Sequence, residues 1–551
     1  MKIYCTNLGR YITVDGGTSL RRIAVDLRDE LPFEPICARV NNKTESLEYE
    51  VYHPKQVEFL DITSPSGSRV YLRSLCMILY RALYEIAPRC SLRIEHSISR
   101  GYYCRIDGME PDERNAGRLK AEMRRLVDRD LPFVRHEKLT ADVIPVLREQ
   151  GLDAKVELLD TTRTLYTTYY TLDGVSDSYY GALAVRTGII SRFDLRPYHE
   201  GFLLLSFDPA DPSRTAEPIP QEKMYEAFTD YLRFNRIIGV QNVGQLNRVV
   251  GEGRTADIIN VAEALHERSI SHIADDIADR YAKGGARIVL ISGPSSSGKT
   301  TSTKRLAIQL MTRLLKPQMI SLDDYFVDRH HTPRDEDGEY DYESLYALDL
   351  KQFNADLTRA LAGEEVALPT YNFQTGAREY RGNTIHITDG SILLIEGIHG
   401  LNPELTAQIP EEMKYRLYVS ALTTLSIDDH NWVPTTDTRL LRRIVRDAKY
   451  RGISAESTLR RWPSVRRGEE KWIFPYQENA DAMFNSSLIF ELAVIKDYAD
   501  SLLRNVPQDV PEYAEAYRLR KFLSYFLPIS SQSVPSTSIL REFLGGSSFK
   551  Y

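Results

Sequence analysis

The chain has 551 residues, of which 42% are apolar and 27% charged, and its formal net charge at pH 7 is −7. This length predicts two or more domains, because single hydrophobic cores stop growing at roughly 250–300 residues. The composition excludes wholesale disorder, and 70 Lys and Arg against 77 Asp and Glu exclude a chain-wide attraction for nucleic acid. Any anion site must therefore be local.

The cysteines and the N-terminus indicate a reducing compartment. The cysteines are odd in number, none is spaced as CxxC, and all lie in the first fifth of the chain: Cys5, Cys37, Cys76, Cys90 and Cys104. This pattern argues against a disulfide framework or a zinc ribbon. The first residues lack the apolar core of a secretory signal, and no window approaches about 18 consecutive apolar residues. We expect a cytoplasmic protein with no membrane partner.

Residues 1–62 alternate apolar and polar side chains in short runs around one helix-like stretch at 19–31. This alternation predicts a small mixed sheet with one helix. The segment ICARVNNKTESLEYEV, at 36–51, resembles a strand and turn of the TGS domain, a ubiquitin-like β-grasp module at the N-terminus of threonyl-tRNA synthetases. The resemblance implies a TGS-like domain over 1–62.

Residues 63–221 combine helical periodicity at 70–86, a polar helix at 111–129 and several strand-like segments, which predicts an α+β domain. SISRGYYCRID and DSYYGALAVRTGIISRFDLR resemble two segments of the second additional, or editing, domain of the same synthetases.

The reactive residues of that editing domain are replaced here. Its site uses an HxxxH helix pair with a cysteine and a histidine, and the matching positions hold Arg73, Met77, Tyr179 and Leu183. These side chains cannot reproduce imidazole and thiolate ligands. The resemblance therefore implies a regulatory or substrate-presenting module without hydrolysis of mischarged tRNA. We expect the scattered His53, His96, His136 and His199 to be surface or hydrogen-bonded polar residues.

The remaining chain divides into three parts. Residues 222–282 are amphipathic and helical, and we expect a helical connector. Over 283–500, apolar strands alternate with helices, which predicts a parallel α/β sheet. Residues 501–551 predict a C-terminal helical segment with a polar tail. The expected fold class is thus multidomain, with α+β N-terminal domains and an α/β domain in the C-terminal half.

A phosphate-binding loop lies at the start of the α/β region. The GxxxxGK[ST] pattern is formed by Gly293, Pro294, Ser295, Ser296, Ser297, Gly298, Lys299 and Thr300, and Thr301 follows it. A buried-strand run at 287–292 precedes the loop and helical periodicity at 301–315 follows it. Such a loop turns backbone N–H groups toward phosphates at a helix N-terminus. We expect it to bind ATP, with Lys299 on the β- and γ-phosphates and the Thr300 hydroxyl on Mg²⁺.

Three further segments supply the charges that phosphoryl transfer requires. The strand ILLIEG ends in Glu396, a candidate metal ligand, and MISLDDYF places Asp323 and Asp324 after a second strand as candidates for the base. Arginines recur along a helix and its end, which indicates a lid that closes on ATP: Arg439, Arg442, Arg443, Arg446 and Arg451.

These motifs, in this order, resemble the uridine kinase and phosphoribulokinase family of P-loop kinases over 283 to about 500. GPSSSGKTT is similar to the family's loop, and the first aspartate of SLDDYF takes the role of catalytic base, which implies Asp323. YDYESLYALD implies Asp341 on ribose hydroxyls, LPTYNF implies Tyr371 stacking on the base, and ILLIEG implies Glu396 as the acidic strand residue. The segment TRLLRRIVRDAKYRG resembles the lid, with Arg443 toward the acceptor and Arg446 and Arg451 toward phosphate.

Departures from the family pattern concentrate where a base would be bound. The sequence has Gly376 for a histidine, Phe326 for a tyrosine in the substrate-binding set, and Ile453 for a lid arginine. We expect a nucleoside kinase, uridine kinase-like, that uses ATP and Mg²⁺ to phosphorylate a 5′-hydroxyl. Two alternatives stay open: a sugar phosphate or other small alcohol as acceptor, and an RNA-binding ATP switch in which the N-terminal domains hold RNA. A homo-oligomer also stays open.

Overall fold

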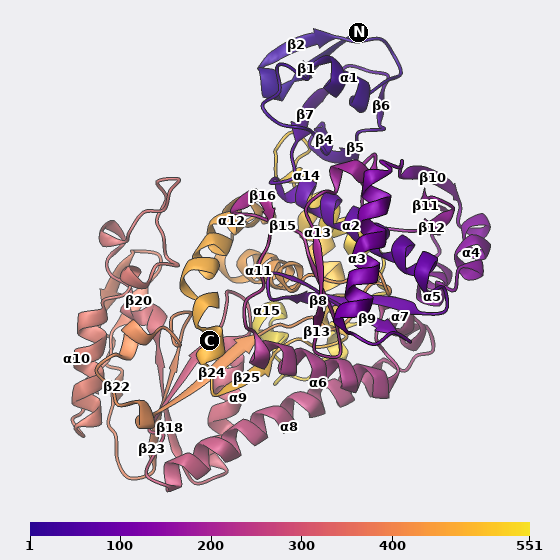
Figure 1. The fold of residues 1–551 in the computed structure, drawn as a ribbon. Coiled ribbons are helices and arrows are strands. Elements are labelled where there is room, and N and C mark those ends of the chain that lie inside the picture. The colour runs from indigo at the N-terminus through magenta and orange to yellow at the C-terminus, as the bar shows by residue number, and fades with distance from the viewer. Residues whose placement is uncertain (551) are drawn as a thin grey trace.

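A parallel α/β domain occupies the C-terminal half of the chain, and a mixed sheet, an α+β unit and three helices precede it (Figure 1). This arrangement is that of a computed structural model, which describes residues 1–550. Among these residues, no helix combines the length and the apolar character needed to cross a membrane.

The N-terminal unit is a five-stranded sheet in the order β2-β1-β7-β4-β5, and Figure 1 shows it at the edge of the molecule. Its strands are β1 (Lys2–Cys5), β2 (Arg10–Thr13), β4 (Cys37–Val40), β5 (Lys43–Ser46) and β7 (Gln56–Leu60), with a short pair β3 (Thr18–Ser19) and β6 (Glu50–Val51) beside it. Strands β1 and β7 are parallel, and the other pairs are antiparallel. Helix α1 (Leu20–Asp26) begins at Ser19, whose hydroxyl accepts the backbone N–H of Arg22. The mixed sheet with one α-helix is as expected, and its assignment to the TGS type stays a prediction.

The second unit is built around α2 (Pro65–Ile86), which is buried along most of its length. One antiparallel sheet has the order β13-β14-β9-β8 and a smaller one the order β10-β11-β12. The strands are β8 (Ser91–Ile98), β9 (Gly101–Asp107), β10 (Val134–Leu139), β11 (Tyr166–Leu172), β12 (Val175–Asp177), β13 (Asp194–Tyr198), β14 (Gly201–Leu205), β15 (Phe207–Asp208) and β16 (Asp211–Thr215). The other helices are α3 (Glu113–Asp128), α4 (Thr140–Glu149) and α5 (Asp153–Thr162).

His96, on β8, corrects one expectation. The side chain is buried and stacks on Phe228, with ring centroids 3.7 Å apart. Neither ring nitrogen has a hydrogen-bond partner among the described residues, and burial lowers the pKa of His96 to about 3. The expectation of a surface or hydrogen-bonded histidine is therefore wrong here, because an aromatic partner more than a hundred residues away encloses the ring.

Three helices connect the halves: α6 (Glu222–Ile238), α7 (Val243–Gly251) and α8 (Thr255–Ala282). The last of them places Ile270, Ile273 and Ile277 against one face of the C-terminal sheet. Figure 1 shows α8 running along this sheet and α6 between the halves.

The C-terminal sheet is parallel throughout and has the order β18-β23-β17-β24-β25. Its strands are β17 (Ile288–Ser292), β18 (Lys316–Ser321), β23 (Ser391–Glu396), β24 (Lys414–Ser420) and β25 (Ala482–Asn485). Because the strands are parallel, their carboxyl ends lie along one edge, where such sheets bind ligands. The turns that carry Gly293 and Asp323, and Glu396 itself, all lie at that edge.

Helices cover both faces of this sheet. Helix α9 (Lys299–Met311) packs with α8 on one face, and α10 (Leu350–Leu361) packs on the other. Two short antiparallel strand pairs flank the second face: the hairpin of β20 (Thr370–Asn372) with β21 (Ala377–Glu379), and the outer pair of β19 (Val366–Ala367) with β22 (Thr384–Ile385). The later helices are α11 (Thr435–Arg451), α12 (Ala455–Trp472), α13 (Glu491–Leu503), α14 (Tyr513–Leu523) and α15 (Arg541–Leu544).

A buried loop from the α/β domain, residues 421–434, enters the second unit directly before α11 begins. Asp428 lies 2.8 Å from Lys155 Nζ, and the same Nζ lies 2.9 Å from Asp177. Trp432 packs against the core of the second unit. The two halves of the chain therefore meet at a buried interface that contains Lys155, Asp177 and Asp428, which we call the seam. Loop 421–434, which forms one side of the seam, leads into α11, the helix that carries the arginines.

Candidate active site

The backbone of the phosphate-binding loop is turned by residues that adopt left-handed conformations. The φ angles are +58° at Ser296 and +85° at Gly298, immediately before α9 begins. Gly293 lies so close to Val419 that a Cβ atom there would be 1.9 Å from the Val419 carbonyl oxygen. The turn therefore leads into a helix N-terminus, the geometry that an anion cradle needs.

Lys299 and Thr300 connect this loop to the end of β23. Lys299 Nζ donates to the carbonyl oxygens of Gly293 at 2.9 Å and Pro294 at 3.2 Å. Thr300 Oγ1 donates to Glu396 Oε1 at 3.0 Å. Burial lowers the pKa of Lys299, and the charges of Glu396 and Asp323 act in the opposite direction. The structure thus brings together the lysine, the hydroxyl and the acidic strand end that the sequence singles out.

Glu396 lies between the ends of two neighbouring strands at this edge. In the register of the parallel sheet it is paired with Ile291 on one side and Ser321 on the other. Burial raises the pKa of Glu396 to about 7; Lys299 lowers it, and Asp323 raises it further. A carboxylate hydrogen-bonded to a threonine hydroxyl supplies the hard oxygen ligands that Mg²⁺ prefers, so Thr300 and Glu396 fit the predicted metal site.

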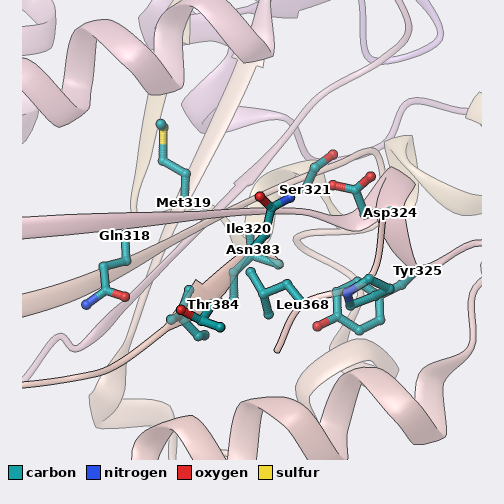
Figure 2. Close-up of a pocket in the computed structure, with 11 residues that line it drawn as sticks. Gln318, Met319, Ile320, Ser321, Asp324, Tyr325, Leu368, Asn383 and Thr384 are labelled. Atoms are coloured by element: carbon teal, nitrogen blue, oxygen red, sulfur yellow. The ribbon is translucent and has the colours of Figure 1, made fainter. Parts of the chain in front are cut away.

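The two adjacent aspartates after β18 have different environments. Asp323 is exposed, and it is close enough to Lys299 and Glu396 for its charge to raise the pKa of both. Asp324 Oδ1 instead accepts the Tyr371 N–H at 3.1 Å, and burial raises its pKa. Asp324 also lines a cavity of about 300 Å³ beside β18, which Figure 2 shows. Of the two candidates for the base, Asp323 is thus the one near the loop.

The acidic segment that follows places a second carboxylate close to the loop. Asp341 is half-buried, and its Oδ1 accepts the backbone N–H of Glu343 at 3.1 Å. Burial raises the pKa of Glu343 to about 7, while Arg443 and Lys299 lower it. Glu343 Oε2 is buried without a hydrogen-bond partner in the described part of the chain. The sequence indicates Asp341, whereas the structure places Glu343 within the electrostatic reach of Lys299. Sequence reasoning missed Glu343, and the only sign of it was that it is an acidic residue two positions after Asp341.

Four aromatic rings form a cluster beside these carboxylates. The Phe326 ring centroid is 5.5 Å from that of Tyr371 and 5.7 Å from that of Tyr342, and Tyr371 is 5.0 Å from Phe373. Phe373 is exposed, and the buried Tyr371 hydroxyl has no hydrogen-bond partner among residues 1–550. Phe326 and Tyr371, both expected in the substrate-binding set, are therefore neighbours.

Arg329 fills the space next to Gly376, a position at which a histidine is expected from the family that the chain resembles. A Cβ atom at Gly376 would lie 2.8 Å from Arg329 Cβ, and Gly376 has φ +72°. The Arg329 backbone N–H donates to the Gly376 carbonyl at 2.8 Å. Any larger side chain at 376 would meet Arg329, so Arg329 occupies the space that a side chain at this position would need.

Two of the arginines grouped in the predicted lid are structural. Arg439 pairs with Glu469 and Arg442 with Glu491, and all four side chains are almost fully buried. Arg439 Nη1 donates to the Ser295 carbonyl at 3.1 Å, and Arg442 Nη1 donates to the Ser296 carbonyl at 3.4 Å. Contrary to the expectation from the sequence, Arg439 and Arg442 therefore do not belong to a lid, because they are buried and hold the backbone of the phosphate-binding loop in place.

The other three arginines gather around Asp447, on the same helix. Arg443 Nε lies 3.2 Å, Arg446 Nη2 3.1 Å and Arg451 Nη1 3.4 Å from an Asp447 oxygen. Arg443 Nη1 also donates to the Ser295 hydroxyl at 2.8 Å, so it reaches the loop directly. Burial lowers the pKa of Arg446, and Arg451 at the helix end is exposed. The structure thus places Arg443 at the loop and holds the other two beside it.

Comparisons with known proteins relate the C-terminal part of this chain to a family of kinases. Residues 288–489 match the family model described as Phosphoribulokinase / Uridine kinase family. Proteins named uridine kinase from Staphylococcus aureus strains JH9 and Newman are 29% identical over 195 residues, which is 35% of this chain and 84% of each relative.

Solved structures of similar chains were also found. One titled as a possible uridine kinase from Bacillus stearothermophilus is 22% identical and covers 38% of this chain and 98% of its own, with a TM-score of 0.25. A putative fructose transport system kinase from Silicibacter sp. TM1040 is 18% identical and covers 39% and 98%, with a TM-score of 0.28.

Proposed function

We propose that this chain, whose residues 288–489 form a P-loop kinase domain of the phosphoribulokinase and uridine kinase family, transfers the γ-phosphoryl group of ATP to a nucleoside. The observation that carries the proposal is the 3.0 Å contact between Thr300 Oγ1 and Glu396, with Lys299 and Asp323 within electrostatic reach. A phosphate loop, a metal-binding pair and an exposed carboxylate meet at one sheet edge, which is the set that phosphoryl transfer needs.

Each part has a defined task. The loop N–H groups from Gly293 to Thr301 and the Lys299 ammonium bind the triphosphate. Thr300 and Glu396 would hold Mg²⁺, which when bound neutralises phosphate charge. Asp323 accepts the proton of the acceptor hydroxyl, while Arg443, Arg446 and Arg451 stabilise the negative charge that develops. Catalysis on this account is positioning plus electrostatics.

The aromatic cluster supports a nucleoside as acceptor. Tyr371 and Phe326 are buried neighbours in this cluster, and the exposed Phe373 ring packs against Tyr371, so the cluster offers an aromatic wall on which a planar base stacks. Asp341 and Glu343 flank Tyr342 of this cluster in the sequence, burial raises the pKa of Glu343 while Lys299 lowers it, and carboxylates are suitable acceptors for ribose hydroxyls. The S. aureus relatives are named uridine kinases, so uridine is the first nucleoside to test.

One observation favours a second candidate acceptor. Arg329 lies next to the aromatic cluster, and its Nη2 donates to the Phe373 carbonyl. Burial raises the pKa of Tyr371, and the charge of Arg329 acts in the opposite direction. A guanidinium at this position suits an anionic acceptor such as a sugar phosphate. The acceptor panel below therefore includes phosphorylated alcohols.

The N-terminal half is proposed to be regulatory. Arg73, at one of the replaced editing positions, is buried and its Nε donates to the Ala182 carbonyl at 3.1 Å. A Cβ atom at Gly181 would lie 2.5 Å from the Arg73 guanidinium carbon, so this side chain fills the space against that segment. These contacts support a retained fold whose hydrolytic groups have been replaced by packing residues.

The proposal is tested by ADP release with MgATP and a panel of nucleosides, sugar phosphates and unphosphorylated sugars. We expect stimulation by at least one nucleoside, with uridine first. Thr300→Val should abolish the stimulation by removing the metal-binding hydroxyl, whereas Thr303→Val, whose hydroxyl bonds the Lys299 carbonyl at 2.9 Å, is the matched control. Stimulation by sugar phosphates alone would select the second candidate, and no stimulation by any compound would reject both.

A further inference from the structure

The C-terminal segment, residues 535–550, folds back onto the phosphate-binding loop. Figure 1 places the C-terminal end near the middle of the molecule, and the Lys550 carbonyl accepts a hydrogen bond from Lys304 on α9. Ile539 is fully buried, and its Cγ2 would lie 2.7 Å from a Cβ atom at Gly298. The segment therefore packs directly against the phosphate-binding loop.

Two further contacts fix this segment to the arginine helix. The Phe543 ring lies against the Arg442 guanidinium, 5.1 Å from its carbon to the ring centroid. Lys449 Nζ donates to the Leu544 carbonyl at 2.6 Å. The turn α15 is thus held between α9 and α11, the two helices that border the nucleotide loop.

Glu542, on this turn, presents a carboxylate to the first turn of α9. Its Oε2 accepts the Thr301 N–H at 3.2 Å and the Thr301 hydroxyl at 2.6 Å. The first N–H groups of a helix have no acceptor within the helix, and an anion there is favoured by the helix dipole. Glu542 therefore occupies an anion position at the N-terminus of the loop helix.

The same position is one that a bound nucleotide requires. In a loop of this kind the N–H groups at the helix start cradle the α- and β-phosphates. The charge of Glu542 raises the pKa of both Lys299 and Glu396, so it acts on the groups assigned to phosphate and metal. A polyphosphate and the Glu542 carboxylate repel each other and compete for the same donors.

We propose that Glu542 is an internal competitor of the nucleotide, and that its carboxylate leaves Thr301 when ATP binds. This inference rests on the proposed function in that the loop is taken to bind ATP. The C-terminal segment then acts as a gate. While Glu542 is hydrogen-bonded to Thr301, the affinity for nucleotide is reduced, and release of the segment raises this affinity. Since α15 also contacts α11, the release reaches the helix that carries Arg443 and Arg446.

The test measures the dissociation constants of ATP and ADP without acceptor, by titration calorimetry on the full chain. Glu542→Gln keeps the size of the side chain and removes its charge, so we expect binding about tenfold tighter than in the unmodified protein. Glu542→Ala should act in the same direction. The matched control is Asp509→Asn, which removes one exposed carboxylate from the C-terminal region and should leave the constants unchanged. Equal or weaker binding in Glu542→Gln would overturn the gate.

Lys299→Ala separates failure of the gate from failure of the proposed function. If the unmodified protein binds ATP through Lys299 and Glu542→Gln binds equally well, only the gate is rejected. If no variant binds ATP, the proposed function and the gate are both rejected. Binding by Glu542→Gln alone would support the gate most strongly.

Amide hydrogen exchange supplies a readout of the movement itself. We expect the amides of residues 535–550 to exchange faster when ATP is present, and those of Glu542→Ala to exchange faster without ATP. Unchanged or increased protection on ATP binding would contradict release of the segment.

Discussion

Arg439 and Glu469 form an ion pair in which the side chains are only 1% and 0% exposed, and the same Glu469 carboxylate accepts the Ser295 N–H at 3.0 Å. The pair thus joins α11 to α12 and holds the phosphate-binding loop with one carboxylate. Its removal should affect both the stability of the fold and the shape of the loop.

Glu469→Gln should lower the free energy of unfolding by about 3–5 kcal/mol, because it leaves the Arg439 charge buried without its partner. Burial would raise the pKa of Glu469, but Arg439 and Arg466 hold it below its ordinary value. The pair therefore stabilises above the unfolded-state pKa of about 4.3 and loses this contribution as pH falls below it.

Urea denaturation of Glu469→Gln and of the control Glu470→Gln compares the loss of unfolding free energy in the two variants. Glu470 is 61% exposed and pairs with Arg466 at 3.0 Å, so its loss should cost under about 1 kcal/mol. Equal losses of unfolding free energy in the two variants would show that the buried Arg439–Glu469 pair stabilises the fold no more than the exposed pair.

Lys155→Met should destabilise the seam between the two halves. The ammonium lies between Asp177 and Asp428 and is 1% exposed, so its removal leaves both buried carboxylates without it, and Asp177 keeps its 2.8 Å contact with His430. We expect a loss of about 3–5 kcal/mol and weaker ATP binding, because loop 421–434 leads directly into α11. Lys120→Met, at a half-exposed pair with Asp194, is the control. Normal ATP binding in a folded Lys155→Met protein would mean that the seam does not reach the loop.

The raised pKa of Glu396 predicts opposite pH trends for stability and for metal binding. Its folded-state pKa of about 7 exceeds the unfolded value of about 4.3, so its stability contribution is complete below pH 4.3 and lost as pH rises through about 7. Mg²⁺ requires the ionised carboxylate, so Mg²⁺-dependent ATP binding should strengthen over the same range.

Thermal unfolding without ligand and ATP titration with Mg²⁺, each across pH 5–9, measure the two trends. Glu396→Gln should reduce the stability trend and remove the metal trend. Glu343→Gln, whose parent carboxyl also has a pKa of about 7, should reduce the stability trend and leave the metal trend in place. Metal binding that is independent of pH would argue against Glu396 as the ligand.

The sequence predicts those features of this arrangement that depend on residues close together in the chain. The strand, loop and helix around Lys299, and the strand that ends at Glu396, follow from patterns within about fifteen residues, and the parallel sheet confirms them. The closeness of Asp323 follows as well, because parallel strands share one carboxyl edge.

The features that the sequence does not predict depend on partners that are distant in the chain. Arg439 and Arg442 have the same spacing as surface arginines, and only Glu469 and Glu491 make them structural. Glu542 lies 241 positions after Thr301, and no periodicity connects the two. The enclosure of His96 by Phe228 has the same origin, since an isolated histidine carries no sign of the ring that covers it.

Tyr371→Ala should raise the KM of the nucleoside with little change in kcat. Stacking of a base on an aromatic ring contributes roughly 1–3 kcal/mol, so we expect an increase of about tenfold or more. Tyr380→Ala, which removes an exposed ring near the end of the same hairpin, should leave KM unchanged. If Tyr371→Ala lowers kcat alone, Tyr371 does not stack on the base.

The central claim is tested most directly by transfer of the labelled γ-phosphoryl group from ATP to uridine in the unmodified protein and in Asp323→Asn. The account predicts a 5′-phosphorylated product, a rate lowered by about 10²–10⁴ in Asp323→Asn, and an unchanged ATP dissociation constant. A variant that transfers phosphate at the normal rate, or a product labelled at another position, would contradict it.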